Sequence, residues 1–313
     1  MPAAPEISGV VVHWSNEAEL GRLVAAWPED SRFELIVVDN GSTSPLPPGP
    51  YQLLSPGRNL GFAGGVNRGV AAAAAPVVLL LNPDARPEPG ALERLLEGLV
   101  RHPEAAGLAP RLVGEGGQPQ FRWQLRRLPM AAELCREALF GEVVRGPRDE
   151  PPAGTPVEQP AAAALALRKE ALATLGGLDE GYFPAWFEDV DLGRRLRSSG
   201  RPLLYWPDAV FRHGQGASVP RLGYGLFLWI YDRNARRYLR RHHGRVWAGV
   251  FRAARSLGLI LRLLLSPVLR PRRAGSRQEA LLGQAAALAG VLSGWRWPRS
   301  WARRHTPPRP DHG

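Results

Sequence analysis

The first hundred residues alternate between short apolar runs and stretches with helical spacing. Four runs rich in valine and leucine predict strands, at residues 7–14, 33–39, 51–55 and 76–82. Three helical patterns lie among and after them, at residues 16–27, 64–75 and 89–102. Continuous apolar strands separated by helices are typical of a mostly parallel sheet that is covered on both faces. This pattern therefore predicts an α/β fold with a mostly parallel central sheet flanked by helices.

A polar or acidic side chain follows nearly every one of these predicted strands. In open α/β sheets, ligands bind beyond the carboxyl ends of the strands. We therefore examine the residues just past each strand as candidates for a ligand site, namely Asn16, Glu17, Asp39, Arg58, Asn59, Asn82 and Asp84.

The first candidate lies in the motif VVDNGS, where Asp39 ends a buried run. Aspartate, asparagine and glycine are common in turns because they tolerate unusual backbone angles, so the motif fits a simple turn. It equally fits a carboxylate acceptor that faces a donor edge, such as the N–H of a pyrimidine base.

The glycine-rich stretch RNLGFAGGVNRG, residues 58–69, resembles a dinucleotide fingerprint only weakly. Its spacing is wrong, and it follows the third predicted strand rather than the first. Small residues still let a backbone approach a ligand, and a helix start at Gly64–Gly65 would offer free N–H groups to a phosphate. Close packing of helix on sheet through glycine is the other interpretation, and the two are compatible.

The motif LLLNPDA places Asn82 and Asp84 on either side of a proline after a buried strand. Asp84 is a hard oxygen ligand suited to Mg²⁺ or Mn²⁺, although the same letters form a Pro-Asp turn. His213, in FRHGQGAS, is the kind of second donor that would complete a metal site begun by Asp84. A lone histidine is more often structural, so its interest depends on this partner.

The stretch WFEDVDLGRRL, residues 186–196, holds Glu188, Asp189 and Asp191. Acids followed by arginines are typical of a helix start, here expected over 189–199. Trp186 and Phe187 before the acids favour a second hypothesis, an aromatic wall beside a general base. Like-charged neighbours and partial desolvation raise the pKa of a carboxyl group toward that of a useful base.

The remaining chain gives coarser expectations. Residues 145–156 are rich in proline and glycine and predict a mobile loop. We expect a strand at 160–168, a helix from Lys169 to the glycine turn 176–177, two short strands around a Pro-Asp turn within 201–214, and a long helix at 221–243. The expected organisation is a catalytic domain at 1–220, a helical and basic extension at 221–305, and a flexible tail at 306–313.

Composition limits the class of protein. The chain has 313 residues and a formal charge of +11, almost all of it from arginine, since Lys169 is the sole lysine. A single cysteine, Cys135, excludes an internal disulfide framework and a cysteine-based metal site. The first residues show no secretory signal, and the apolar run at 257–269 is too short to span a bilayer and contains Arg262. We therefore expect a cytoplasmic protein.

Taken in order, five motifs resemble family 2 glycosyltransferases, the inverting nucleotide-sugar enzymes with a GT-A fold, and in particular their rhamnosyltransferase-like branch. The motifs lie between about Ile7 and Ser218 and read VVDNGS, RNLGFAGGVNRG, LLLNPDA, GGLDEGYFPAWFEDVDLGRRL and FRHGQGAS. The resemblance implies the GT-A (nucleotide-diphospho-sugar transferase) fold, followed by a C-terminal helical extension.

The resemblance also implies roles for the matching positions. Asp39 would bind the nucleotide base, within a donor pocket formed with Arg58, Asn59, Gly61, Gly65, Asn67 and Asn82. The run Asn82-Pro83-Asp84 is similar to the D-x-D metal motif, so that Asp84 and His213 would hold Mg²⁺ or Mn²⁺. Asn82 replaces the first acid, so no metal contact is carried over to it. Asp189 would be the general base, with Trp186, Glu188 and Asp191 on the acceptor side, where the two acids either contact the acceptor or hold the loop and helix start.

The implied reaction is transfer of a sugar from a nucleotide-diphospho-sugar donor to a glycan or polyprenyl-linked acceptor in cell-surface polysaccharide synthesis. Rhamnose from dTDP-rhamnose is the best guess for the donor. Other donors (a UDP-hexose, UDP-galactofuranose or a GDP-sugar) and an inactive scaffold remain alternatives.

The basic segment 245–273 fits either a membrane interface, peripheral on the inner face of the plasma membrane, or a packing helix or homodimer contact. Despite the charge of +11 we expect no nucleic-acid binding, because the arginines form no recognisable binding motif and strand ends rich in acids suit nucleic acid poorly.

Overall fold

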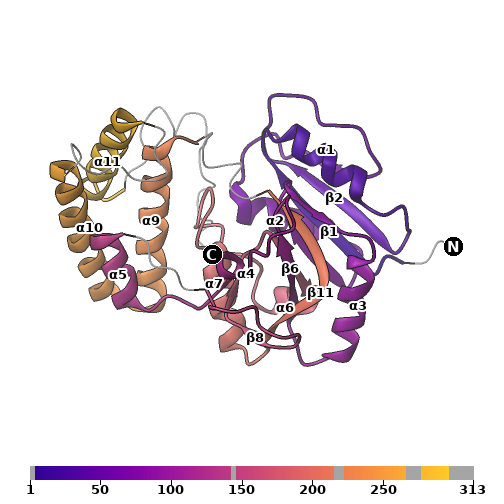
Figure 1. Cartoon of the computed structure of the whole chain (residues 1–313). Coiled ribbons are helices and arrows are strands. Elements are labelled where there is room, and N and C mark those ends of the chain that lie inside the picture. Colours follow the sequence, from indigo (N-terminus) through magenta and orange to yellow (C-terminus); the bar gives the residue numbers. More distant parts are fainter. Residues whose placement is uncertain (1–3, 142–145, 215–221, 266–275, 296–313) are drawn as a thin grey trace. The chain divides into compact units, whose positions relative to one another are not determined.

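A computed structural model describes residues 4–141, 146–214, 222–265 and 276–295 (Figure 1). The chain divides into two compact units. The first, here called the sheet unit, comprises Met1–Leu128, Arg145–Gly181 and Glu188–Gln215. The second, the helical unit, comprises Pro129–Val144, Tyr182–Phe187 and Gly216–Gly313. The expected tail at 306–313 lies outside the described residues, as do 266–275 and 296–305 of the expected extension.

The sheet unit is built on one nine-stranded sheet among the described residues, with the order β3-β2-β1-β4-β10-β6-β11-β5 and with β8 paired to β11. Its strands are β1 (Ile7–His13), β2 (Phe33–Asp39), β3 (Gln52–Leu54), β4 (Val77–Leu81), β5 (Ala85–Pro87), β6 (Gly107–Val113), β8 (Pro156–Val157), β10 (Ala164–Arg168) and β11 (Leu203–His213). The pairs β2–β3, β1–β2, β1–β4 and β6–β11 are parallel, whereas β10 runs antiparallel to β4 and β6. The predicted mostly parallel sheet is confirmed.

Helices cover both faces of this sheet. Alternate residues of each strand point to opposite sides, and strands such as β1 and β4 are mostly apolar and buried on both sides. The sheet unit has α1 (Glu17–Ala26), α2 (Gly61–Ala72), α3 (Ala91–Arg101), α4 (Phe121–Gln124), α6 (Lys169–Thr174) and α7 (Glu188–Ser198). Leucines of α1 and α3 pack with one set of strand residues, and apolar residues of α2, α6 and α7 pack with the alternate set. Figure 1 shows helices on both sides of the sheet. A small second sheet pairs β7 (Leu125–Arg126) with β9 (Gln159–Pro160).

The segment predicted as two short strands around a Pro-Asp turn is instead one strand, β11. Its ladder with β6 is interrupted by a bulge between Trp206 and Val210, at the position of the Pro-Asp pair. The predicted turn is therefore wrong, because the Pro-Asp pair lies within the bulge and the chain does not reverse there. A bulge inserts extra residues into one strand while the strand continues in the same sheet.

Helix α2 begins at Gly61, not at Gly64–Gly65 as the sequence predicted. Gly65 lies in the helix interior, where a Cβ atom would lie 2.7 Å from Cγ1 and 2.9 Å from Cγ2 of Val12. One turn further along, a Cβ on Gly69 would lie 2.3 Å from Cγ1 of Val10. The glycines therefore let α2 pack directly on β1.

We expect Gly65→Ala to lower the free energy of unfolding by about 1–3 kcal/mol, because the added methyl group overpacks against Val12. Alanine is otherwise the better helix former by about 1 kcal/mol. Gly249→Ala is the matched control, since no atom lies within 4 Å of a Cβ at this helical glycine. Urea unfolding of both variants checks the prediction, which is wrong if the two substitutions stabilise the protein equally.

The helical unit consists, in its described part, of α5 (Ala131–Phe140), α9 (Tyr224–His242), α10 (Arg245–Leu265) and α11 (Arg277–Leu292). Helix α9 corresponds to the long helix predicted at 221–243. Near the start of α9, Gly225 approaches Gly283 of α11 so closely that a Cβ would lie 3.0 Å from the Gly283 Cα atom. Helix α10 is joined to α9 by a buried ion pair, with Arg255 Nε 2.7 Å from Asp232 Oδ2. No helix within the described residues has the length and apolar character needed to cross a membrane.

Candidate active site

The parallel strands bring the candidate residues of the sheet unit to one edge of the sheet. In the ladder between β1 and β2, His13 is the register partner of Asp39, so these two strands end level with each other. Strand β4, on the other side of β1, leads directly into Asn82 and Asp84. The carboxyl ends of neighbouring parallel strands thus carry the motifs that the sequence singled out.

Asn40, which the sequence analysis passed over in favour of Asp39, connects two of these motifs. Its buried side chain accepts a hydrogen bond from Leu60 N at 2.6 Å and donates to Asn59 Oδ1 at 3.1 Å and to Gly61 O at 3.3 Å. Asn59 Oδ1 also accepts from Gly61 N at 2.8 Å. The amide side chains of VVDNGS and RNLG therefore fix the start of α2 against the end of β2.

The same turn is held from two more sides. Gly41 has φ = +87°, and a Cβ there would lie 3.2 Å from Asn59 N, so only glycine fits this close approach. Asp39 Oδ1 accepts from Ser42 N at 3.0 Å, and Ser42 Oγ accepts from Ser15 N at 3.1 Å. Asp39 is thus a turn residue, as one interpretation held, and its half-buried side chain lies at the strand end, as the other requires.

Arg58 is exposed, and its backbone lies against the turn at Gly41. Asn67 lies further along α2 and is engaged by the loop after α6. Its Nδ2 donates to Leu178 O at 2.9 Å and to Glu180 Oε1 at 2.9 Å, and its Oδ1 accepts from Leu178 N at 2.9 Å. In this structure Asn67 ties the glycine turn before the aromatic stretch to α2.

Asp84 and His213 are brought together by strand pairing. Ala85, directly after Asp84, is the register partner of His213 in the β5–β11 ladder, and Gly214 N donates to Asp84 O at 3.1 Å. Asp84 Oδ1 lies 3.5 Å from His213 Nε2. The residues 82–85 do form a turn, with Ala85 N donating to Asn82 O at 3.0 Å. The turn presents the Asp84 carboxylate to the histidine, so the turn found here is compatible with a metal-ligand role for Asp84.

Gln120 holds the imidazole on its Nδ1 side. It is a buried residue that no sequence pattern identified. Gln120 Nε2 donates to His213 O at 2.8 Å, which turns Gln120 Oε1 toward His213 Nδ1 at 3.0 Å. An oxygen in that place accepts a hydrogen bond from Nδ1–H, so the lone pair of Nε2 faces Asp84. Trp123 stacks on the imidazole, with ring centroids 5.1 Å apart.

The electrostatics of this pair suit a cation. Burial lowers the pKa of His213 despite the opposing effect of Asp84, so the imidazole is neutral at pH 7. Burial likewise raises the pKa of Asp84, with His213 acting in the opposite direction. A carboxylate oxygen and an imidazole nitrogen lone pair separated by 3.5 Å are placed as two ligands of one small divalent ion. Within the described residues no group of three or more histidine, cysteine or acidic side chains forms a fuller metal cage.

Asp189 lies in the first turn of α7 and faces the small β7–β9 sheet. Its Oδ2 accepts from Gln159 Nε2 at 3.3 Å and lies 3.8 Å from Arg126 Nη2, while Oδ1 accepts from Val190 N at 2.8 Å. Arg126 and Gln159 are themselves register partners. Gly193 allows this arrangement, because a Cβ there would lie 2.4 Å from Glu158 O. The carboxylate is held in one orientation and its side chain remains 15% exposed.

The neighbouring acids differ from Asp189. Glu188 is buried, and desolvation together with the charge of Asp189 raises its pKa well above the ordinary value. Asp191 is fully buried and accepts from Arg195 Nε at 2.7 Å; Arg195 in turn donates to Leu175 O at 3.0 Å and Gly177 O at 2.9 Å. Of the two roles that the sequence left open for Asp191, the structure shows it holding the helix start to the glycine turn.

The aromatic pair before the acids belongs to the helical unit. Trp186 and Phe187 both have left-handed backbone angles, with φ values of 71° and 75°. Asn234 of α9 donates from Nδ2 to Ala185 O at 2.8 Å and to Trp186 O at 3.1 Å. The Trp186 ring packs edge-on against Phe227, with centroids 4.9 Å apart. Non-glycine residues in this conformation are costly and persist only where the surrounding structure holds them, as Asn234 does here.

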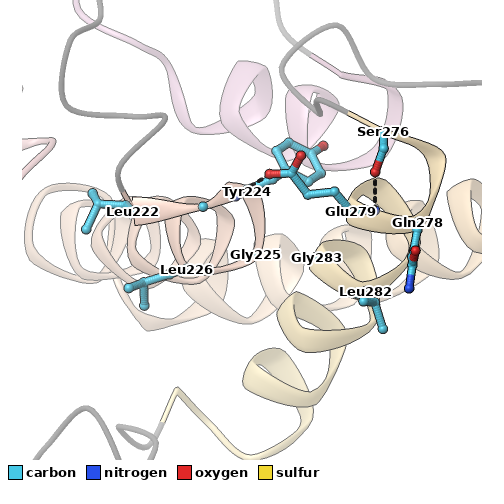
Figure 2. Close-up of a pocket in the computed structure, with 10 residues that line it drawn as sticks. Leu222, Tyr224, Gly225, Leu226, Ser276, Gln278, Glu279, Leu282 and Gly283 are labelled. Atoms are coloured by element: carbon cyan, nitrogen blue, oxygen red, sulfur yellow. Dashed lines mark hydrogen bonds between the residues drawn. The ribbon is translucent and has the colours of Figure 1, made fainter.

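A pocket of about 430 Å³ lies elsewhere, in the helical unit, between the starts of α9 and α11. Figure 2 shows its lining, which includes Leu222, Leu226 and Leu282 and one acid, Glu279. Glu279 Oε1 accepts from Tyr224 N at 3.3 Å, and Ser276 caps the start of α11 through Glu279 N (Figure 2). Glu279 is therefore engaged in capping the starts of α9 and α11, and the candidate active site is the group of residues at the carboxyl edge of the sheet.

Comparisons with known proteins identify the family to which the chain belongs. A sequence model described as "Glycosyl transferase family 2" matches residues 10–146. An N-acetylglucosaminyl-diphospho-decaprenol L-rhamnosyltransferase of Mycobacterium tuberculosis is 31% identical over 239 residues, covering 68% of this chain and 77% of that protein. A pre-mycofactocin glycosyltransferase of the same organism is 32% identical over 223 residues, covering 68% of this chain and 43% of that protein.

The fold is shared more widely. A mannosyltransferase of Pyrobaculum calidifontis, solved in complex with GDP-Man and Mn²⁺, superposes with a TM-score of 0.53 over 95% of this chain and 88% of that one, at 13% identity. This likeness shows the GT-A fold. The chain thus belongs to family 2 of the glycosyltransferases, is similar to rhamnosyltransferases within it, and is a transferase enzyme.

Proposed function

We propose that the chain transfers a sugar, with inversion, from a nucleotide-diphospho-sugar to a hydroxyl group of a glycan or polyprenyl-linked acceptor. The observation that carries the proposal is the Asp84–His213 pair, a two-donor cation site at the carboxyl ends of the strands. Rhamnose from dTDP-rhamnose is the proposed donor, because a relative at 31% identity is named as a rhamnosyltransferase with a decaprenol-linked acceptor.

Asp84 and His213 would hold Mg²⁺ or Mn²⁺, and their donor set fits such an ion. A hard carboxylate oxygen and a neutral imidazole nitrogen are common ligands of Mn²⁺, and with two protein ligands the donor phosphates and water can fill the other positions. When bound, the ion neutralises charge on the leaving nucleotide diphosphate. Gln120 orients His213, as outer ligands of metal sites generally do.

On the donor side, Asp39 would accept a hydrogen bond from the nucleotide base. Asn59 and Gly61, fixed by Asn40, would shape the pocket wall together with Arg58, whose exposed guanidinium suits the diphosphate. In this proposal Gly65, Asn67 and Asn82 complete the pocket. Gly65 and Asn67 act through the packing of α2 on β1 and on the 178–180 loop.

On the acceptor side, Asp189 would take the proton from the attacking hydroxyl group. The oxygen then bonds to the anomeric carbon from the face opposite the nucleotide, whose bond to the sugar breaks, so the configuration inverts. Gln159 and Val190 N hold the carboxylate oxygens in place for this step. Buried Glu188 would support the base from within, and Trp186 would contact the acceptor sugar.

We further propose that the reaction takes place in the cytoplasm on acceptors held at a membrane surface, and that a second copy is the alternative partner of residues 245–305. The test that follows distinguishes dTDP-rhamnose from the alternative donors, namely a UDP-hexose, UDP-galactofuranose or a GDP-sugar. It also distinguishes an active transferase from an inactive scaffold.

A panel of nucleotide sugars tests the proposal by thermal unfolding with and without Mn²⁺. A true donor at about 100 times its Kd is expected to stabilise the protein by about 2.7 kcal/mol, and only when the ion is present. An Asp84→Ala variant is the control, and its donor response should no longer depend on Mn²⁺. The proposal is wrong in its donor if another nucleotide sugar gives the response, and wrong in its chemistry if none does.

A further inference from the structure

Helix α10 departs from the usual pattern of a surface helix. Its inward side includes two arginines among apolar residues, with Arg255 paired to Asp232 and Arg262 Nη1 donating to Ala138 O at 3.2 Å. Much of its exposed surface, from Val246 to Leu264, is apolar. A surface helix normally places its polar side chains outward and its apolar ones inward.

The outward residues repeat at helical spacing and form one continuous apolar stripe. They are Val246, Val250, Ala253, Leu257, Ile260, Leu261 and Leu264. Val246 is 79% exposed at one end of the helix, and Leu264 is 72% exposed toward the other. Seven apolar residues on one face are far from the scattered exposed leucines that are normal on a protein surface.

Helix α11, which packs against α10, extends the same character. From Ala280 to Leu292 it has no charged residue, and its Leu282 and Leu292 are each 64% exposed. The two helices therefore present apolar side chains to solvent as well as to their neighbours.

The charge around this stripe is strongly positive. Helix α10 itself carries four arginines and no acidic residue, and residues 222–265 as a whole contain nine arginines and one aspartate, a formal charge of +8. Arg245 and Arg252 are exposed and lie along one side of the stripe. Apolar side chains flanked by arginines match the two layers of a membrane interface, acyl chains below and anionic headgroups above.

We infer that the outer face of α10 binds the surface of a membrane that contains anionic lipids. A second copy of the chain is a poorer occupant, because it would bring a second charge of +8 against the first with no acidic side chain on the stripe to offset it. The proposed function places the acceptor at a membrane surface, and this inference identifies the part of the chain that contacts that surface. It rests on the proposed function only for the location of the acceptor. Lipid binding needs neither donor nor base.

Vesicle co-sedimentation of the full-length protein tests the inference without any sugar present. Vesicles of phosphatidylcholine with about one-third phosphatidylglycerol are expected to bind the protein, and vesicles of phosphatidylcholine alone to bind it at least about fivefold more weakly. Binding to the anionic vesicles should weaken as salt is raised from about 0.1 M to 1 M, since the charge attraction is screened.

Two variant pairs separate the apolar and charged contributions. The double variant Val246→Gln/Leu264→Gln should weaken binding at least about tenfold, whereas Leu53→Gln/Val100→Gln changes two exposed apolar residues of the sheet unit and should leave binding unchanged. Arg245→Gln should weaken binding about fivefold, and Arg101→Gln on α3, with the same loss of charge, should not. All six positions are exposed, so folding is expected to be preserved.

The inference is wrong if the wild-type protein does not sediment with anionic vesicles, or if the α10 variants bind these vesicles as well as their controls do. A dimer in analytical ultracentrifugation that dissociates in Val246→Gln/Leu264→Gln, with no vesicle binding by the wild type, would assign the stripe to a second copy instead. The two proposals are tested separately. A protein that binds nucleotide sugars but not vesicles contradicts only this inference, and a protein that binds vesicles but no nucleotide sugar contradicts only the proposed function.

Discussion

Asp189→Asn is expected to lower the rate of sugar transfer by about 100- to 10,000-fold, the usual contribution of a general base. The amide has the size of the carboxylate and can keep its place beside Gln159 and Arg126, but it cannot accept the proton of an acceptor hydroxyl group. Because Asp189 is proposed to act on the acceptor, the donor should still bind. The variant should therefore give the same Mn²⁺-dependent thermal shift with the nucleotide sugar as the wild type.

The measurement pairs a transfer assay with circular dichroism and the donor-binding shift. Glu170→Gln is the matched control, since it makes the same kind of change at a largely exposed carboxylate on α6 whose partner is Arg201. Turnover near the wild-type rate in a folded Asp189→Asn protein would remove Asp189 as the base. Attention would then move to Glu188, the buried acid beside it.

Asp84→Ala and His213→Ala are each expected to lower transfer by at least about 100-fold and to remove its response to added Mn²⁺ or Mg²⁺. Thorough chelation of the wild-type protein should have the same effect and be reversed by the ion. Gln120→Leu should weaken metal affinity by a smaller factor, about 10- to 100-fold, because it frees the imidazole to rotate without removing a ligand.

The pH dependence of metal binding follows from the same pair. An ion needs Asp84 ionised and His213 neutral, so metal affinity should fall as the pH drops and either group takes up a proton. Burial raises the pKa of Asp84, which moves its loss of affinity to a higher pH than for an ordinary aspartate. Burial lowers the pKa of His213, which keeps that ligand neutral down to a lower pH than usual. Isothermal titration with Mn²⁺ across pH checks this, and activity that survives chelation would contradict the site.

The sheet and its ligand-binding edge could be predicted because they depend on local patterns. Valine-rich runs such as 7–14 and 33–39 form strands wherever both faces are covered, and the residue after each run must then lie at the carboxyl edge. Asp39 and Asp84 were found in this way. His213 was a candidate only through its possible partnership with Asp84, since nothing local in FRHGQGAS indicates that the two side chains face each other.

The residues that support the site could not be found so easily, because each acts through a partner far away in sequence. Gln120 reaches His213 across 93 positions, and Asn40 reaches Leu60 across 20. Glutamine and asparagine have no periodicity that marks them as buried. The start of α2 was misplaced for a related reason. The sequence predicts a helix start at Gly64–Gly65, whereas Gly65 lies inside the helix and lacks a side chain because Val12 packs against it.

The strained pair Trp186–Phe187 was likewise hidden from the sequence. Large aromatic residues rarely adopt left-handed backbone angles, and the pattern of letters predicts a helix start directly after them. The conformation is held by Asn234, which lies in an arginine-rich helix some fifty residues downstream. A local reading therefore identifies the acids but not the loop that precedes them.

The bulge in β11 sets which way His213 faces. Between Trp206 and Val210 the strand takes four steps where β6 takes one, from Pro110 to Arg111, so three residues are extra. Since side chains alternate, an odd insertion reverses parity. Leu204 and Trp206 join one core cluster before the bulge, and Ala209 and Phe211 join the same cluster after it. His213, two residues beyond Phe211, therefore lies on the same side of the sheet as Leu204 and Trp206, although an unbroken alternation would put it on the other side. The odd number of extra residues, more than their chemical identity, thus lets β11 turn His213 toward Asp84.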